Sequence, residues 1–245
     1  MSKRGISILI HGPAKVGKST LADTAPAPRL FLDVEMGSDF TPSKKIFWDP
    51  IREKPPVPDG TWDTCVVYVR EYDIVDKTYE WLNSGQHPFR SVILDSISEG
   101  QVRAKDRLAG PDGMDLKKWG KLLQQVGGAA RKFRDLVTHP VKPIEAVVII
   151  AMTQQRNGTG DWTPYVEGQL RHSLPYLYDM LAYLAKPVRN QDGSFARLLY
   201  TGPVPGYDAG GRFEQLLPHV IDNPNITDML QRIREGADQA KGEVA

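Results

Sequence analysis

Residues 12–19 read Gly-Pro-Ala-Lys-Val-Gly-Lys-Ser, which is a complete G-x-x-x-x-G-K-[ST] motif. The apolar stretch before it, Ile6–Ile10, is typical of a buried strand, and the residues after it are expected to begin a helix. A glycine-rich turn between a strand and a helix presents backbone N–H groups to a phosphate, and the helix start adds a partial positive charge. The stretch therefore predicts a phosphate-binding loop.

The motif assigns roles to its side chains. Lys18 is expected to reach the β- and γ-phosphates of a nucleotide, and the Ser19 hydroxyl is expected to face Mg²⁺. The residues predicted to contact the nucleotide are Gly12, Pro13, Ala14, Lys15, Val16, Gly17, Lys18, Ser19 and Thr20.

Composition restricts the class of protein. A chain of 245 residues with 40% hydrophobic residues suits one α/β domain with a sizeable core. The net charge of +1 gives no global basic field, so a DNA site would need local patches. A lone cysteine, Cys65, excludes an internal disulfide framework and fits a reducing cytoplasm. Residues 1–5 show no secretion signal and no apolar run reaches 18 residues, so we expect a cytoplasmic protein without a membrane partner.

Apolar strands alternate with helices along the chain. Strands are expected at 30–34, 65–69, 91–95 and 146–151, helices at 73–82 and 115–137, and a surface excursion at 41–60. This alternation predicts a mostly parallel central sheet flanked by helices. Met180–Lys186 and Arg197–Tyr200 are expected to form a late antiparallel hairpin at one edge.

Two further expectations concern helices. Within 115–137, an apolar stripe beginning at Leu116 is expected to face the core. Residues 1–224 are predicted to form the core domain, and 225–245 a helix to about Gly236 followed by a frayed tail.

Carboxylates follow two predicted strands. Asp95 ends the strand 91–95 and is predicted to hold Mg²⁺ opposite Ser19, although it also suits the N-cap of a helix from Ser96. Glu35 follows the strand 30–34 and is predicted to orient the water that attacks the γ-phosphate. A solvated strand-end charge is the alternative for Glu35, and the nearby Asp33 and Asp39 are rival bases.

Neutral and basic residues follow the strand 146–151. Gln154 is expected to sense the γ-phosphate and pass its presence to the loop after it. That loop, 155–171, contains Arg156, Trp162 and Arg171, which suit phosphate contacts and base stacking with single-stranded DNA. An ordinary flexible loop is the alternative.

Three further cations have two interpretations each. Lys117 and Lys118 lie beside a glycine-rich stretch and are predicted to form a second phosphate-contacting patch, with a solvated helix face as the alternative. Arg212 follows Gly210-Gly211, and we expect it to reach a neighbour's γ-phosphate on a glycine hinge, with a plain surface arginine as the alternative.

The order of four segments, GPAKVGKST, LFLDVE, SVILDSIS and VVIIAMTQQR, resembles the RecA-like P-loop ATPase core over about residues 5 to 217. More narrowly, it is similar to phage nucleotide-binding proteins that include the Sak-type single-strand annealing ATPases. The resemblance implies ATP and Mg²⁺ as cofactors, Glu35 as catalytic glutamate, Asp95 as Walker B aspartate and Gln154 as the coupling glutamine. It also places Arg212 where this family often has an Ala-Lys-x-Arg finger acting in trans, with Gly210 at the lysine position.

The resemblance implies a phage ATP-dependent DNA recombination protein that binds single-stranded DNA and promotes annealing or pairing. ATP hydrolysis would occur at the interfaces of a homo-oligomer, either a ring or a filament, and a single-strand binding protein is a further candidate partner. The alternatives are a DNA-independent P-loop NTPase, a small-molecule kinase, a replication or packaging accessory ATPase, and a binding module in which ATP only orders the oligomer.

Overall fold

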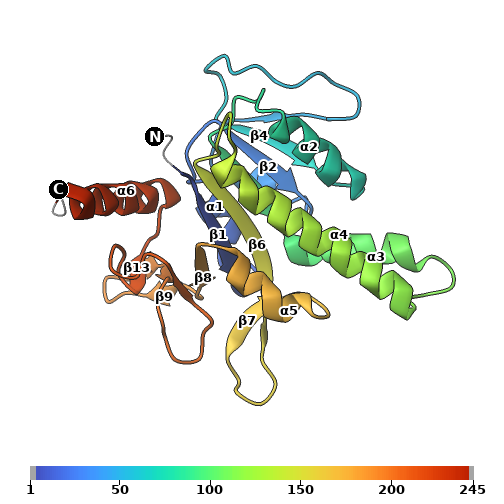
Figure 1. The fold of residues 1–245 in the computed structure, drawn as a ribbon. Helices are drawn as coiled ribbons and strands as arrows, with labels where there is room; N and C mark the ends of the chain where they lie inside the picture. Colours follow the sequence, from blue (N-terminus) through green and yellow to red (C-terminus); the bar gives the residue numbers. More distant parts are fainter. Residues whose placement is uncertain (1–3, 243–245) are drawn as a thin grey trace.

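A computed structural model describes residues 4–242 (Figure 1). Its centre is a mixed sheet of 11 strands in the order β13-β11-β8-β1-β6-β5-β2-β4-β3, with β12 paired to β8 and β7 paired to β6. The strands are β1 (Ile6–His11), β2 (Arg29–Asp33), β3 (Lys45–Phe47), β4 (Thr64–Tyr68), β5 (Ser91–Asp95), β6 (Ala146–Gln155), β7 (Trp162–Tyr165), β8 (Met180–Leu184), β9 (Val188–Arg189), β10 (Phe195–Ala196), β11 (Leu198–Tyr200), β12 (Gly210–Gly211) and β13 (Val220–Asp222). The helices are α1 (Lys18–Ala22), α2 (Asp73–Asn83), α3 (Ile97–Ala109), α4 (Leu116–Asp135), α5 (Leu170–Ser173) and α6 (Ile226–Gly242), with 3₁₀ turns η1 (Ser38–Phe40), η2 (Leu136–Thr138) and η3 (Leu174–Leu177).

The strands from β8 to β3 in the sheet order run parallel, and the predicted α/β fold is confirmed. β6 lies between β1 and β5, with His11 opposite Ala151 and Asp95 opposite Ile150. The carboxyl ends of these three strands therefore meet at one edge of the sheet, which is where ligands bind in such folds.

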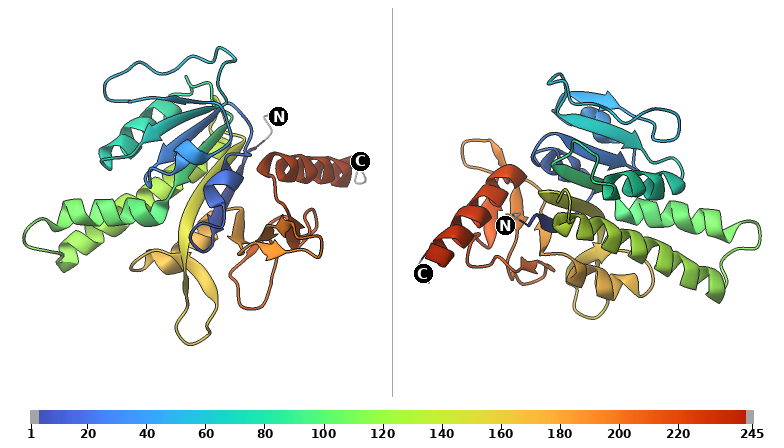
Figure 2. Two further views of the ribbon diagram at one scale, coloured as in Figure 1. Left: turned by 180° about the vertical axis from the view of Figure 1, so that it is seen from behind. Right: turned by 45° about the horizontal axis from the view of Figure 1, so that its top comes forward.

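Helices cover both faces of the sheet, as Figures 1 and 2 show. Side chains such as Leu9, Leu32 and Ile149 point toward α2, α3 and α4. Those of Ile8 and Ile10 pack on the opposite face with α1 and α6. Because both faces are buried, the middle of each central strand is a nearly continuous apolar run rather than an alternating pattern, and this run predicted a parallel sheet.

The predicted late hairpin is confirmed, and the structure adds detail to it. β8 pairs antiparallel with β11, while the short β9 and β10 pair with each other inside the hairpin. β12 and β13 join the same edge and were not predicted. Among the residues described, no helix has both the length and the apolar character to cross a membrane.

Several local expectations were wrong. The excursion 41–60 contains β3, which extends the sheet beside β4. A helix after Asp95 was considered only as the alternative in which Asp95 is an N-cap, and α3 does form there, from Ile97. Leu116 is 90% exposed, so the buried stripe of α4 starts further along, at Leu122.

The C-terminal helix is also longer than predicted. α6 continues to Gly242, beyond the expected end near Gly236, so 237–242 are helical rather than a frayed tail. The last part of that tail, 243–245, lies outside the described residues. The proposed division at residue 224 stays a prediction, although α6 places Met229 and Leu230 in the same apolar cluster as Ile8.

The packing of α4 gives a stability prediction. Phe133 is fully buried and its ring lies 5.7 Å from that of Tyr79 on α2. Phe133→Ala should lower the free energy of unfolding by about 3–5 kcal/mol through lost burial and the remaining cavity. Leu116→Ala on the same helix is the matched control and should change it little. Urea denaturation measures this, and a similar loss of unfolding free energy in the two variants would contradict this packing.

Candidate active site

The loop 12–17 leaves the end of β1 and enters α1, and two of its glycines are required by the geometry. A Cβ on Gly12 would lie 2.3 Å from the carbonyl oxygen of Leu184 on β8. Gly17 has φ +98°, in the region that side chains disfavour. The loop can therefore lie close against β8 and turn into α1 only with glycine at these two positions.

Lys18 is folded back over this loop. Its Nζ donates hydrogen bonds to the carbonyl oxygens of Gly12 at 3.0 Å and Pro13 at 2.8 Å. Burial lowers the pKa of the Lys18 ammonium, while the carboxylates of Asp95 and Glu35 oppose that shift. The Lys18 charge is thus held at the loop, within the electrostatic influence of the Asp95 and Glu35 carboxylates.

Ser19 and Asp95 are in direct contact. The Ser19 hydroxyl donates to Asp95 Oδ2 at 2.5 Å, although the two residues come from different motifs. Asp95 is 4% exposed, and burial raises its pKa to about 7. The hydrogen bond from Ser19 opposes this shift, whereas the carboxylates of Glu35 and Asp33 add to it. The N-cap of α3 is Ser96, whose Oγ accepts from the Glu99 N–H, so Asp95 does not serve as that cap.

The donor set fits Mg²⁺. Ser19 and Asp95 offer hard oxygen ligands, and a divalent cation would stabilise a buried carboxylate whose neighbours are also acidic. Within residues 4–242, no group of three or more His, Cys, Asp or Glu side chains forms a metal cluster. Mg²⁺ at Ser19 and Asp95 would therefore need nucleotide oxygens and water to complete its shell.

Three carboxylates near the end of β2 differ in availability. Asp33 accepts from the backbone N–H groups of Glu35 and Ser38, so it is committed to the turn after β2. Asp39 accepts from the Tyr68 hydroxyl. Glu35 is exposed, and its Oε1 accepts from the hydroxyl of Ser96, the residue after Asp95. Its assignment as the base stays a prediction, and its position beside Asp95 supports it over its two rivals.

β6 is longer than predicted, which changes the environment of Gln154. Thr153 and Gln154 lie inside β6, and the segment after it forms a hairpin in which Gln154 is opposite Thr163 of β7. The stretch 155–171 is therefore the β6–β7 hairpin and α5 rather than a flexible loop. Gln154 is half-buried just beyond the level at which β1 and β5 end.

His11 joins the loop to this hairpin. It is fully buried immediately before Gly12, with Nδ1 at 3.1 Å from Thr153 Oγ1 and Nε2 at 2.7 Å from the carbonyl oxygen of Asp208. Burial lowers the His11 pKa to about 4, so the ring is neutral near pH 7. A carbonyl only accepts, so Nε2 carries the proton. Nδ1 faces the Thr153 hydroxyl, which also donates to the carbonyl oxygen of Thr163 at 3.1 Å.

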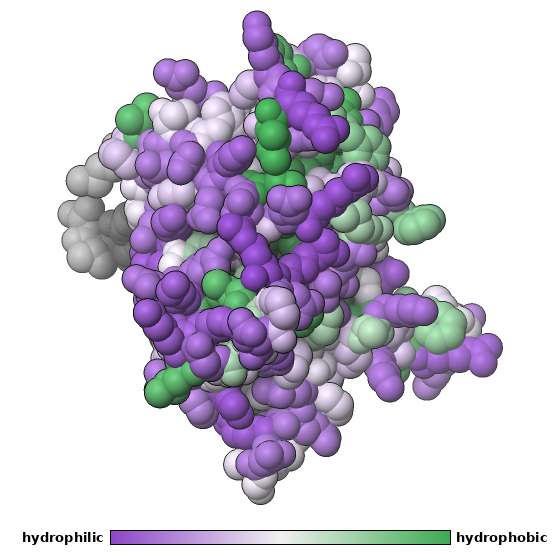
Figure 3. Space-filling view, turned by 90° about the vertical axis from the view of Figure 1, so that its right-hand side faces the viewer, coloured by the Kyte–Doolittle hydropathy of each residue, from purple (hydrophilic) through white to green (hydrophobic). Residues whose placement is uncertain are grey.

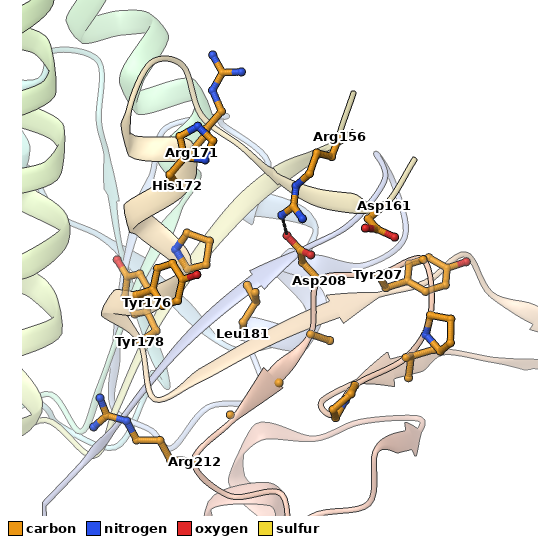
Figure 4. A pocket seen from close by; sticks show the side chains of 18 of the residues that line it. Arg156, Asp161, Arg171, His172, Tyr176, Tyr178, Leu181, Tyr207, Asp208 and Arg212 are labelled. Atoms are coloured by element: carbon orange, nitrogen blue, oxygen red, sulfur yellow. Dashed lines mark hydrogen bonds and ion pairs between the residues drawn. The ribbon is translucent and has the colours of Figure 1, made fainter. Parts of the chain in front are cut away.

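A hollow of about 1210 Å³ lies beside the hairpin, between α5 and η3 on one side and residues 203–212 on the other (Figure 4). Its lining includes three arginines and three exposed or half-buried aromatic and imidazole side chains, namely Arg156, Arg171, Arg212, His172, Tyr176 and Tyr207. Arg156 and Arg171 therefore line the same hollow. Arg156 forms an ion pair with Asp208 at 2.5 Å, and Trp162 lies half-buried in β7.

Lys117 and Lys118 lie elsewhere, at the start of α4 (Figure 1). Lys118 Nζ donates to the carbonyl oxygens of Ala109 and Gly113, so it closes the turn between α3 and α4. Lys117 is exposed. Figure 3 faces this side of the molecule and shows a mostly hydrophilic surface with scattered apolar residues. The two lysines are thus separate from the hollow, and a phosphate contact there stays a prediction for Lys117.

The predicted glycine hinge before Arg212 was wrong. Gly210 and Gly211 form β12, which pairs with β8, and a Cβ on Gly211 would lie 2.9 Å from the carbonyl oxygen of Asp179. Arg212 itself is 3.2 Å from Asp179 Oδ1. Asp179 accepts from Ser7 near the start of β1, so Arg212 lies at the opposite end of the sheet from the phosphate loop of its own chain.

Sequence reasoning missed two residues near the loop. His11 interrupts the apolar strand directly before Gly12, which was the available signal. Arg197, which precedes β11, reaches the loop from far along the chain: its Nε would lie 3.0 Å from a Cβ on Gly17. No local sequence pattern predicts such a contact.

The matching family model, described as an AAA domain, covers residues 4–213, which include the phosphate loop, Asp95 and the β6–β7 hairpin. The chain belongs to the AAA domain family. Membership suggests ATPase activity for this AAA domain and agrees with its P-loop NTPase fold. No curated protein matches the chain.

The buried Asp95 predicts a pH dependence of stability. The pKa of Asp95 rises from 3.8 in the unfolded chain to about 7 in the folded protein. The contribution of protonated Asp95 to folding stability is therefore full below about pH 4 and is lost as the pH rises to about 7. Without nucleotide and Mg²⁺, Asp95→Asn should therefore be more stable than the wild-type AAA domain at pH 8, with the difference shrinking toward pH 5. Urea denaturation at both pH values measures this. A pH-independent difference would contradict the buried, protonatable state.

The loop and Glu35 should separate binding from turnover. Lys18→Ala removes the charge that holds the phosphates, so it should abolish tight ATP binding and hydrolysis. Glu35→Gln should keep ATP binding and lose most hydrolysis, because only water activation is removed. Binding is measured by calorimetry and turnover by phosphate release. Normal turnover in a folded Lys18→Ala protein would contradict the site, and normal turnover in Glu35→Gln would exclude that base.

Proposed function

We propose that this AAA domain hydrolyses ATP, binds single-stranded DNA and promotes its annealing or pairing, as in the Sak-type phage recombination proteins that its sequence resembles. The observation that carries the proposal is the course of β6. This strand runs between the strand of the phosphate loop and the strand of Asp95, and it continues directly into the hairpin beside the arginine-lined hollow.

The residues at the sheet edge divide the chemistry among them. Lys18 would bind the β- and γ-phosphates, and Ser19 with Asp95 would hold Mg²⁺, which neutralises charge on the phosphate oxygens when bound. Glu35 would accept the proton of the water that attacks the γ-phosphorus as ADP leaves. The contact of Glu35 with Ser96 supports this role, because it holds the carboxylate on the Asp95 side of β2.

Coupling to DNA would pass through His11, Thr153 and Gln154. His11 bonds to both Thr153 at the base of the hairpin and Asp208, whose side chain pairs with Arg156. A shift of the phosphate loop on nucleotide binding would therefore move both the hairpin and the segment around Asp208, both of which line the hollow. These contacts form a contiguous path from the phosphate loop to the hollow, which is the path proposed for the coupling.

The hollow suits a single strand better than a duplex. Arg171 and Tyr176 project from its rim, and Tyr176 is 84% exposed, which suits stacking on a base. Three aspartates also line the hollow, so its net charge is small. DNA affinity should therefore be modest and should fall with salt.

Hydrolysis would require a neighbouring subunit. Arg212 lies far from the loop of its own chain but 63% of its side chain is exposed, so it is available to a second copy. A cation supplied in trans accelerates phosphoryl transfer by orders of magnitude in related systems. We therefore propose a homo-oligomer in which Arg212 completes the site of the next subunit. Mixing Arg212→Ala with Lys18→Ala subunits should restore partial activity, and no rescue would contradict this.

DNA binding tests the proposal directly. The double variant Arg171→Ala with Tyr176→Ala should weaken binding of labelled oligo-dT about tenfold or more in fluorescence anisotropy, because it removes a phosphate contact and a stacking surface. Its basal ATP turnover should stay near wild type, since neither residue touches the phosphate loop. Lys77→Ala, an exposed cation on α2, is the control and should change neither quantity.

Three outcomes would overturn parts of the proposal. Unchanged affinity in the double variant would remove DNA from the hollow. A loss of DNA affinity seen only in Lys117→Ala would place the DNA-binding site at the α3–α4 turn. ATP turnover without any binding of single-stranded DNA would favour a DNA-independent NTPase or a kinase.

A further inference from the structure

Arg197 lies against the phosphate loop of its own chain. A Cβ built on Gly17 would be 3.0 Å from Arg197 Nε and 3.5 Å from Cζ, so the guanidinium packs beside the glycine that precedes Lys18. The two residues are far apart in the sequence and meet because β11 joins β8, whose carbonyl at Leu184 also lies close to Gly12.

The backbone of Arg197 is fixed while its side chain is free. Its N–H donates to Asn223 Oδ1 at 3.1 Å, and its carbonyl oxygen accepts from the Asn223 N–H at 2.8 Å. The next residue begins β11, which is paired on both sides. Within the described part of the chain, the Arg197 guanidinium has no hydrogen bond or ion pair, and the residue is exposed.

Charge explains why such an arginine suits an anion. Lys15 and Lys18 already belong to the loop, so Arg197 brings a third cation to the same short segment. The Asp95 and Glu35 carboxylates act on Lys18, and a bound anion would further offset the repulsion among the three cations. A guanidinium is also permanently charged and binds phosphate oxygens with two parallel donors.

We propose that Arg197 binds the phosphates of the nucleotide in cis, as a contact additional to the motif. This rests on the proposed function of the loop. It is distinct from the role of Arg212, because Arg197 acts within one subunit and on affinity. The contribution of Arg197 to nucleotide affinity should therefore be measurable at protein concentrations where the protein is monomeric.

Substitution of Arg197 tests this. Arg197→Gln should weaken ATP and ADP binding about tenfold in calorimetry, the loss of one charge-assisted contact. Arg197→Lys should retain most of the affinity, because it keeps a cation. Arg232→Gln, an exposed arginine on α6, is the matched control and should bind like wild type. Thermal unfolding midpoints should be unchanged in all three.

Inorganic tripolyphosphate separates a phosphate contact from other effects. Its competition against a fluorescent nucleotide should weaken in Arg197→Gln by the same factor as ATP binding. Unchanged ATP affinity, or weakened ATP affinity with unchanged tripolyphosphate affinity, would overturn the proposal. Undiminished ATP binding by Lys18→Ala would instead overturn the proposed function of the loop, so the two failures are distinguishable.

Discussion

The hydrogen bond between Ser19 and Asp95 is the contact on which the arrangement of the site depends. It joins residues 76 positions apart, and it forms only because β1 and β5 end at the same level on either side of β6. The buried Asp95 carboxylate is costly to ionise without a cation, and its pKa of about 7 reflects that cost. A cation bound beside Asp95 would therefore stabilise the ionised carboxylate.

The insertion of β6 between β1 and β5 has a second consequence. Because β6 continues to Gln155, its last residues, including Gln154, lie beyond the level at which β1 and β5 end. The same strand continues into the hairpin that borders the arginine-lined hollow. His11, the residue directly before the phosphate loop, contacts Thr153 at the base of that hairpin. The phosphate loop and the hollow are thus connected through β6 and the buried His11.

Features encoded locally were predictable from the sequence. The phosphate loop, the apolar strands and α4 follow from short contiguous patterns, and the order of the strands implied that Asp95 and Ser19 would meet. The polar run Thr153–Gln155 resembles a loop because its side chains are polar, although backbone pairing with β7 makes it a strand. The glycines before Arg212 suggested mobility, yet glycine is needed there because β12 lies so close to Asp179. The contacts of His11 and Arg197 depend on distant partners, which no local pattern reveals.

The most direct test of this coupling is hydrogen–deuterium exchange with and without Mg²⁺ and ATP, using Glu35→Gln to hold the bound state. If the site and the hollow communicate through β6 and His11, nucleotide should slow exchange both in the loop 12–19 and in the hairpin 152–165. Exchange in α2, which touches neither, should be unchanged. Protection confined to the loop, with the hairpin unaltered, would contradict the coupling.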